Sequence, residues 1–88
     1  MTYIIKWSPQ SLEFIRKLPK DISLRIRTKV EQAAQNPKHF LESLESIQGD
    51  KLRIGDYRAI IDVLEKDKIF AVRTIGHRKN IYKKYKIK

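Results

Sequence analysis

Three basic side chains lie close together in the sequence around a predicted β-turn. Lys51 and Arg53 precede the dipeptide Gly55-Asp56, and Arg58 follows it. Because a Gly-Asp pair between two runs of β-forming residues is typical of a two-residue hairpin loop, we expect Arg53 to face Arg58 across two antiparallel strands. Directly opposed like charges destabilise a strand pair by roughly 0.2–1 kcal/mol, so the pattern indicates a site for an anion such as a phosphodiester.

Cationic side chains of this kind can support metal-independent cleavage of RNA. In that reaction the 2′-hydroxyl attacks the adjacent phosphate, so the protein must remove a proton, stabilise a phosphorane and protonate the departing 5′-oxygen. We predict that Lys51, crowded by arginines, is the base. The fork-shaped guanidinium groups of Arg53 and Arg58 are expected to bind the scissile phosphate.

A second cluster of polar and aromatic residues follows the last predicted strand, from Gly76 to Tyr82. We expect Arg78 to complete the ring of positive charge, and Tyr82 to stack on a base or to donate a proton. His77 is a further candidate, although its place at the end of a strand favours an ordinary hydrogen-bonding role.

Metal and cofactor chemistry has little support in the sequence. The chain has no cysteine, and its histidines, His39 and His77, lack partners at metal-ligand spacing. It has only 3 glycines and no glycine-rich phosphate loop. We therefore predict neither a metal nor a cofactor.

The chain is strongly basic, with a net charge of +10 on 88 residues. Residues 1–48 carry 8 basic and 5 acidic groups, or +3, whereas residues 49–88 carry 12 and 5, or +7, and no acid follows Asp67. This asymmetry favours a polyanionic partner on one side of the molecule. A basic surface that only aids solubility is the alternative.

The elements that must position these residues follow from periodicity and from helix and turn signals. Ser8 is expected to cap a first helix, and Asp21 or Ser23 a second one that ends before Asn36-Pro37. Residues 38–50 show no clear pattern. The predicted order is a strand over 3–7, helices over 9–18 and from about 21 to 35, strands over 51–55, 57–64 and 68–75, and a short helix or ordered tail over 78–85.

The alternation of the strands sorts the side chains onto two faces of a mainly antiparallel sheet. The core face, which packs on the helices, is predicted to contain Leu52, Ile54, Tyr57, Ala59, Ile61, Val63, Phe70 and Val72. The opposite face is predicted to contain Lys51, Arg53, Arg58, Ile60, Asp62 and Arg73. An ordinary solvated sheet face is the alternative to a binding face.

Two segments together resemble the RelE/ParE superfamily of toxin–antitoxin toxins. They are Leu52-Arg53-Ile54-Gly55-Asp56-Tyr57-Arg58 and Ile75-Gly76-His77-Arg78-Lys79-Asn80-Ile81-Tyr82. The resemblance extends over nearly the whole chain. It implies a single RelE-like toxin domain over residues 1–88 with an α+β fold like that of microbial ribonucleases: an N-terminal strand, and a helical hairpin packed on a three- to four-stranded, mainly antiparallel sheet.

For the RelE branch, the resemblance implies an endoribonuclease that cuts messenger RNA in the ribosomal A site and inhibits translation. It also implies a hetero-oligomer with a RelB-like antitoxin that neutralises the toxin. The residues that match the basic catalytic set and the C-terminal tyrosine of that family are Lys51, Arg53, Arg58, Arg78 and Tyr82.

Two other functions stay open from the sequence. One is a ParE-like toxin that inhibits DNA gyrase or another topoisomerase without cutting nucleic acid, and the other is a non-catalytic nucleic-acid-binding module. The sequence contains no apolar run long enough to span a membrane, and its first residues do not resemble a signal peptide. We therefore expect a cytoplasmic protein with no membrane partner.

Overall fold

The computed structural model describes residues 3–44 and 48–85, apart from the side chains of residues 82, 84 and 85. Within these ranges it has four helices and one five-stranded sheet, so the predicted α+β class is confirmed. The elements in chain order are β1 (Ile4–Trp7), α1 (Pro9–Arg16), α2 (Lys20–Gln35), α3 (Pro37–Phe40), β2 (Leu41–Ser43), β3 (Asp50–Ile54), β4 (Tyr57–Leu64), β5 (Ile69–His77) and α4 (Arg78–Tyr85).

The sheet has the strand order β1-β5-β4-β3-β2. β1 runs parallel to β5, and the other neighbours are antiparallel. The strand number exceeds the predicted three to four, because β1 joins the sheet and residues 41–43 add a short edge strand. Three residues are too few to show an alternating pattern, which explains why β2 was missed.

The two long helices begin in different ways. The Ser8 hydroxyl caps α1 by accepting a hydrogen bond from the backbone N–H of Ser11 at 3.0 Å, as predicted. The predicted cap of α2 is wrong, because that helix starts at Lys20 after Pro19 and has no side-chain cap. The fixed backbone of proline sets the chain direction there, and the Pro19 carbonyl accepts the first helical bond, from Ser23, at 2.9 Å.

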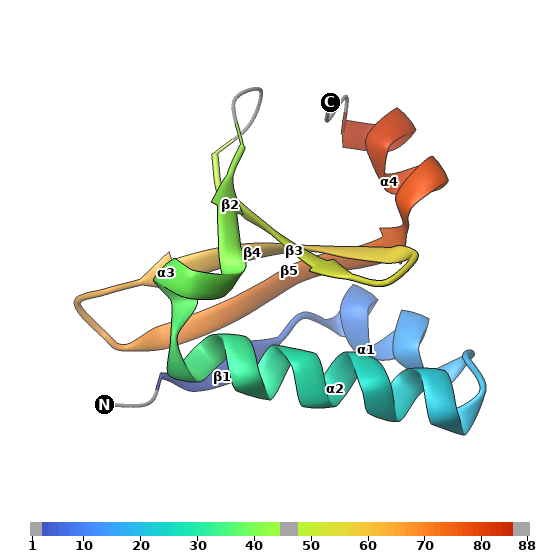
Figure 1. Cartoon of the computed structure of the whole chain (residues 1–88), viewed down its shortest axis with the longest axis horizontal. Helices are drawn as coiled ribbons and strands as arrows, with labels where there is room; N and C mark the ends of the chain where they lie inside the picture. The colour runs from blue at the N-terminus through green and yellow to red at the C-terminus, as the bar shows by residue number, and fades with distance from the viewer. Residues whose placement is uncertain (1–2, 45–47, 86–88) are drawn as a thin grey trace.

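The main core lies between the sheet and the helices α1 and α2, which cover one face (Figure 1). Its buried residues come from those helices and from one face of the sheet, where Ile75 joins the predicted core residues after the register shift between β4 and β5: Ile15, Ile26, Val30, Ala33, Ala34, Leu52, Ile54, Ala59, Ile61, Phe70, Val72 and Ile75.

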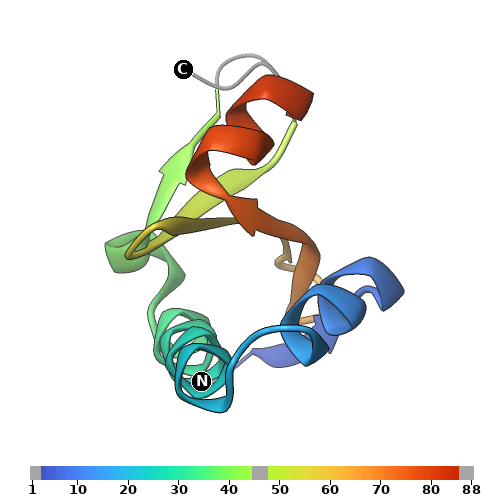
Figure 2. The same ribbon diagram turned by 90° about the vertical axis from the view of Figure 1, so that its right-hand side faces the viewer.

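The helix α4 lies on the opposite side of the sheet from α1 and α2 (Figure 2), where it packs against β5 and β4. Its Ile81 is 3% exposed and packs on Gly76, where an added Cβ would stand 3.4 Å from the Ile81 Cβ. Ile60 and Thr74, which pair in register on the neighbouring strands, are also buried although they lie outside the main core. The face expected to bind a ligand is therefore partly covered by the last helix.

None of the helices in the described ranges is long and apolar enough to cross a membrane.

Candidate functional site

The β3–β4 hairpin has the predicted register. Arg53 pairs with Arg58, and the residues next to the loop, Ile54 and Tyr57, pair with each other. Gly55 has a φ of +59°, while Asp56 is not among the described residues with positive φ. A positive φ at the first loop residue alone corresponds to a type II′ turn, which favours glycine there and matches the twist of the strands.

Arg58 differs from the expected exposed cation, because its side chain folds back onto the turn. It is 5% exposed, and its Nη1 donates hydrogen bonds to the carbonyl oxygens of Gly55 at 2.5 Å and Tyr57 at 2.8 Å. A buried guanidinium needs acceptors, and carbonyls at a turn supply them. Arg58 therefore places a positive charge inside the hairpin end and also braces the loop.

Lys51 and Arg53 share a carboxylate, that of Glu42, which no pattern in the sequence predicts. The Glu42 oxygens lie 3.5 Å from Lys51 Nζ and 3.7 Å from Arg53 Nη1. The side chain of Lys51 is 12% exposed and that of Arg53 is 61% exposed. Glu42 reaches them because β2 pairs with β3 and sets Glu42 opposite Lys51. Only a correct assignment of residues 38–50 as containing a strand would have revealed this neighbour.

Arg78 begins α4 beside the same turn. Its backbone N–H donates a hydrogen bond to the Asp56 carbonyl at 2.8 Å, and its side chain is exposed. The β4–β5 register pairs Arg58 with Gly76, which brings the end of β5 next to the hairpin loop. Arg53, Arg58 and Arg78 therefore come from three elements that meet at one end of the sheet. The side chain of Tyr82 lies outside the described part of the chain.

His77 ends β5 and takes the hydrogen-bonding role favoured by its position. Its Nδ1 accepts a hydrogen bond from the backbone N–H of Lys79 at 3.3 Å. Its ring meets that of Tyr57 edge to face, with centroids 5.7 Å apart, and Tyr57 in turn meets Phe14 at 6.0 Å. These contacts fix the start of α4 against the sheet and α1.

Arg73 lies on the same side of the sheet as Asp62 and forms an ion pair with it. The β4–β5 ladder shifts register between Ile60 and Ile61, which inserts Arg73 opposite that break. Its guanidinium binds both oxygens of Asp62, with Nε at 2.9 Å from Oδ2, and donates to the Gln48 carbonyl at 2.7 Å. Arg73 therefore stabilises the sheet and the segment before β3.

Within the described residues, no group of three or more His, Asp or Glu side chains has a metal-binding arrangement.

The chain matches a family and several solved structures. The sequence model described as "ParE toxin of type II toxin-antitoxin system, parDE" matches residues 5–82. No curated protein sequence matches significantly.

Three structures illustrate the likeness in fold. The RelBE2 toxin–antitoxin complex from Mycobacterium tuberculosis has a TM-score of 0.81 at 16% identity, with 89% of this chain and 93% of that chain covered. An archaeal RelE–RelB complex from Pyrococcus horikoshii has a TM-score of 0.73 at 29% identity, with 89% and 97% covered. A free mutant of E. coli toxin RelE has a TM-score of 0.70 at 20% identity, with 97% and 95% covered.

Proposed function

Because the chain belongs to the ParE toxin family of type II toxin–antitoxin systems, within the RelE/ParE superfamily, we propose that it is a single-domain toxin, over residues 1–88, that cleaves messenger RNA in the ribosomal A site. The observation that carries this proposal is the meeting of Arg53, Arg58 and Arg78 at one end of the sheet, next to Lys51. A polyanion that approaches this end meets fixed positive charge from three elements.

The proposed reaction needs no metal ion. The 2′-oxygen of the substrate forms a bond to the adjacent phosphorus, and the bond to the 5′-oxygen breaks. Lys51, in its uncharged amine form, accepts the proton of the 2′-hydroxyl, while Arg53 and Arg78 bind the phosphate oxygens as negative charge grows on them. Arg58 adds its charge from within the turn and holds the loop that separates these cations. Tyr82 stacks on a base or protonates the 5′-oxygen.

Arg53 offers the clearest test, because its exposed side chain leaves the core unchanged when it is replaced. Primer extension on ribosome-bound message should show cuts with the wild type and about 100-fold slower cutting with Arg53→Gln, the loss that removal of one charge-stabilising donor typically causes. Arg16→Gln removes an even more exposed arginine, on α1, and should cut as the wild type does. Intact message with the wild type, or equal cutting by both variants, would reject the proposed nuclease.

An antitoxin of the RelB type is the proposed partner. The similar structures include complexes of RelE-type toxins with RelB antitoxins. An acidic or amphipathic segment would find complementary charge at the basic end of the sheet and further contacts along α2. A purified cognate antitoxin should suppress cutting of ribosome-bound message, and undiminished cutting at saturating antitoxin would contradict this assignment.

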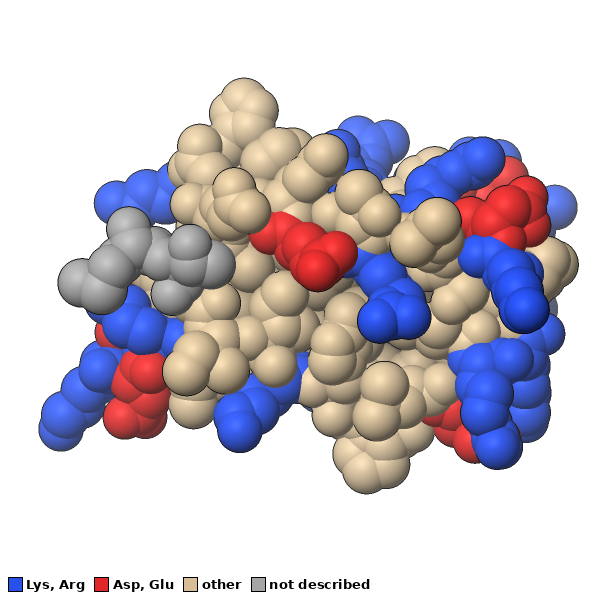
Figure 3. All heavy atoms as spheres, turned by 90° about the horizontal axis from the view of Figure 1, so that it is seen from below, with Lys and Arg blue, Asp and Glu red and all other residues tan. Residues whose placement is uncertain are grey.

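A ParE-like activity is the second candidate, favoured by the matched family and by the exposed helical face. Leu12 on α1 is 53% exposed and Leu24 on α2 is 64% exposed. Figure 3 shows that face as a broad area of uncharged side chains interrupted by separate basic and acidic side chains. Such a surface suits a protein target. This activity predicts inhibition of gyrase supercoiling that survives Arg53→Gln and is lost in the double variant Leu12→Ser, Leu24→Ser.

A further inference from the structure

A second cluster of positive charge lines a hollow between α2 and the end of β3, which pack against each other. The hollow has a volume of about 330 Å³ and is lined by Arg25, Thr28, Lys29 and Gln32 of α2 and by Arg53. Figure 1 shows α2 running along the sheet on the side away from α4. None of the described acidic residues lines the hollow.

Arg25 and Lys29 both line the hollow, and neither has a described counter-ion. They lie four residues apart on one helix face, a spacing at which like charges destabilise a helix by roughly 0.2–0.5 kcal/mol. The Lys29 ammonium lies 4.7 Å from the centroid of the Phe40 ring, and this cation–π contact limits its movement. No ion pair joins Arg25 or Lys29 to an acidic residue in the described ranges. Unneutralised charge at a hollow is a cost that an anionic ligand would remove.

We propose that this hollow binds a backbone phosphate of RNA, at a position separate from the phosphate that is cut. Arg25 and Lys29 supply the positive charge, and the Thr28 hydroxyl and the Gln32 amide supply hydrogen bonds. The inference rests on the proposed function for the identity of the ligand as RNA.

RNA fits the arrangement better than an acidic peptide does, because Arg53 belongs both to this hollow and to the group of cations around the hairpin turn. A nucleic-acid strand carries a phosphate at every nucleotide, so a strand held at one group of cations presents further phosphates along its length. Arg53 therefore marks a continuous basic path from the sheet end to α2.

The test measures how salt weakens binding of a single-stranded 2′-O-methyl RNA oligonucleotide, which cannot undergo 2′-hydroxyl attack. Each phosphate that is neutralised on a single strand contributes about 0.7 to the slope of log K against log salt, so the double variant Arg25→Gln, Lys29→Gln, which loses the one phosphate bound in the hollow, should lower the slope by about 0.7. The matched control is Lys20→Gln, Arg27→Gln, which removes one lysine and one arginine from exposed positions of the same helix outside the hollow. Its slope should equal that of the wild type.

Arg25→Gln alone leaves the contact between Lys29 and Phe40 in place and should show about half the change, which separates loss of a phosphate contact from loss of structure. Equal slopes for the two double variants would overturn the proposal, as would absence of oligonucleotide binding by the wild type. The proposal would also be overturned if the double variant Arg25→Gln, Lys29→Gln lost binding of poly-glutamate while its RNA slope stayed unchanged. The ligand of the hollow would then be an acidic peptide.

Cutting of ribosome-bound message is assayed separately. If the slopes of the two double variants differ as expected but the wild type leaves the message intact, the phosphate site stands and the proposed nuclease function is rejected.

Discussion

The guanidinium of Arg58 lies inside the hairpin end, where it donates to two turn carbonyls. Its replacement by methionine should lower the free energy of unfolding by about 2 kcal/mol, because charge-assisted hydrogen bonds are lost and the carbonyls lose their partner. Arg53→Met, at the exposed partner position, should change it by less than about 0.5 kcal/mol. Urea titration of both variants provides the measurement. Equal free energies of unfolding for the two variants would contradict the role of Arg58 in stabilising the loop. Because replacing Arg58 is expected to cost stability, the test of cleavage uses Arg53 instead.

Glu42 occupies a position between Lys51 and Arg53 where a substrate phosphate would have to compete with it. Glu42→Gln removes this competing charge and should strengthen binding of the 2′-O-methyl oligonucleotide about fivefold, since two charges about 4 Å apart in water interact by about 1 kcal/mol. Fluorescence anisotropy measures the change. Glu31→Gln, an exposed site on α2 with the same change in net charge, should alter affinity less. Equal effects would mean that only the overall charge matters.

Asp50 carries a carboxylate that is costly in the folded state. Burial and, to a lesser degree, the neighbouring Asp62 raise its pKa, while a hydrogen bond from Ser43 lowers it. A raised pKa means that the folded state holds its proton to a higher pH than the unfolded chain does. The stability contributed by protonation is therefore present at low pH and is lost as the pH rises through the folded pKa.

Asp50→Asn should consequently be more stable than the wild type at pH 7, by less than about 1 kcal/mol because solvent screens a partly exposed charge. The difference should shrink as the pH falls towards 3.8, the ordinary pKa of this group. Urea unfolding at a series of pH values tests this. Asp67→Asn, at an exposed position between β4 and β5, provides the control. A wild type more stable than Asp50→Asn at pH 7 would show that the Ser43 hydrogen bond outweighs burial.

At the scale of elements, α4 depends on one buried anchor. Ile81 is 3% exposed against Gly76, whereas Lys83 on the same helix is exposed. Ile81→Ala removes the three buried carbons beyond Cβ and should loosen the helix locally, because α4 lies outside the main core. Hydrogen exchange should become at least tenfold faster in α4 and stay unchanged in β4. Lys83→Ala should leave both unchanged, and equal acceleration in α4 and β4 would mean that the helix supports the whole sheet.

The elements that the sequence predicted well are those with a strong local signal. Helix signals predicted helices over 9–18 and from about 21 to 35, close to the observed α1 and α2, and strand alternation with the Gly55-Asp56 loop fixed the register of the hairpin. In each case the side-chain period or the turn geometry within one or two elements decides the structure.

The candidate site was predicted less completely, because its details depend on contacts between distant segments. The backbone positions of Lys51, Arg53 and Arg58 followed from the hairpin, but the burial of Arg58 depends on where its side chain finds acceptors. Glu42 was missed because β2 has three residues and is formed by pairing with β3. The basic hollow was missed because it needs the packing of α2 against β3, which no local pattern shows.

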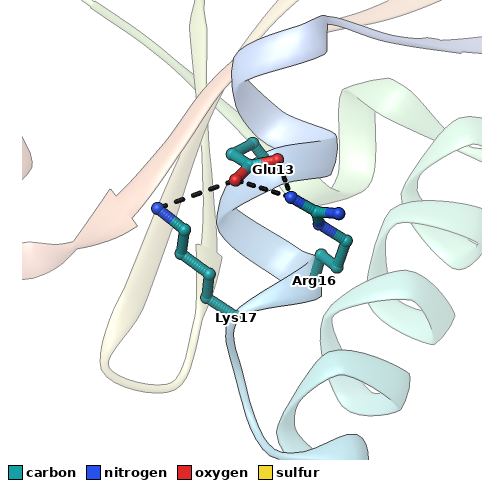
Figure 4. A network of polar contacts seen from close by, with 3 residues as sticks. All are labelled: Glu13, Arg16 and Lys17. Atoms are coloured by element: carbon teal, nitrogen blue, oxygen red, sulfur yellow. Dashed lines mark hydrogen bonds and ion pairs between the residues drawn. The ribbon is translucent and has the colours of Figure 1, made fainter.

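At the scale of the whole molecule, the net charge of +10 opposes folding. Exposed ion pairs offset little of it: Glu13 pairs with Arg16 and Lys17 on the surface of α1 (Figure 4), and this hydrogen-bonded pairing with Arg16 lowers the pKa of Glu13. Because such pairs are solvated and screened by salt, they contribute little to the stability of the fold. Long-range repulsion among the remaining cations is therefore the dominant electrostatic effect on stability.

The size of the molecule gives this repulsion a clear dependence on salt. The structure extends over 31 × 30 × 22 Å, and the Debye length is about 30 Å at 0.01 M salt and about 8 Å at 0.15 M. At the lower concentration nearly every cation repels every other, whereas at the higher one only neighbours interact. We therefore expect the urea midpoint to rise as sodium chloride is raised between these concentrations. The variant Lys20→Gln, Lys66→Gln, which carries two fewer charges at exposed positions, should show a smaller rise. A midpoint that falls with salt would mean that local ion pairs outweigh the repulsion.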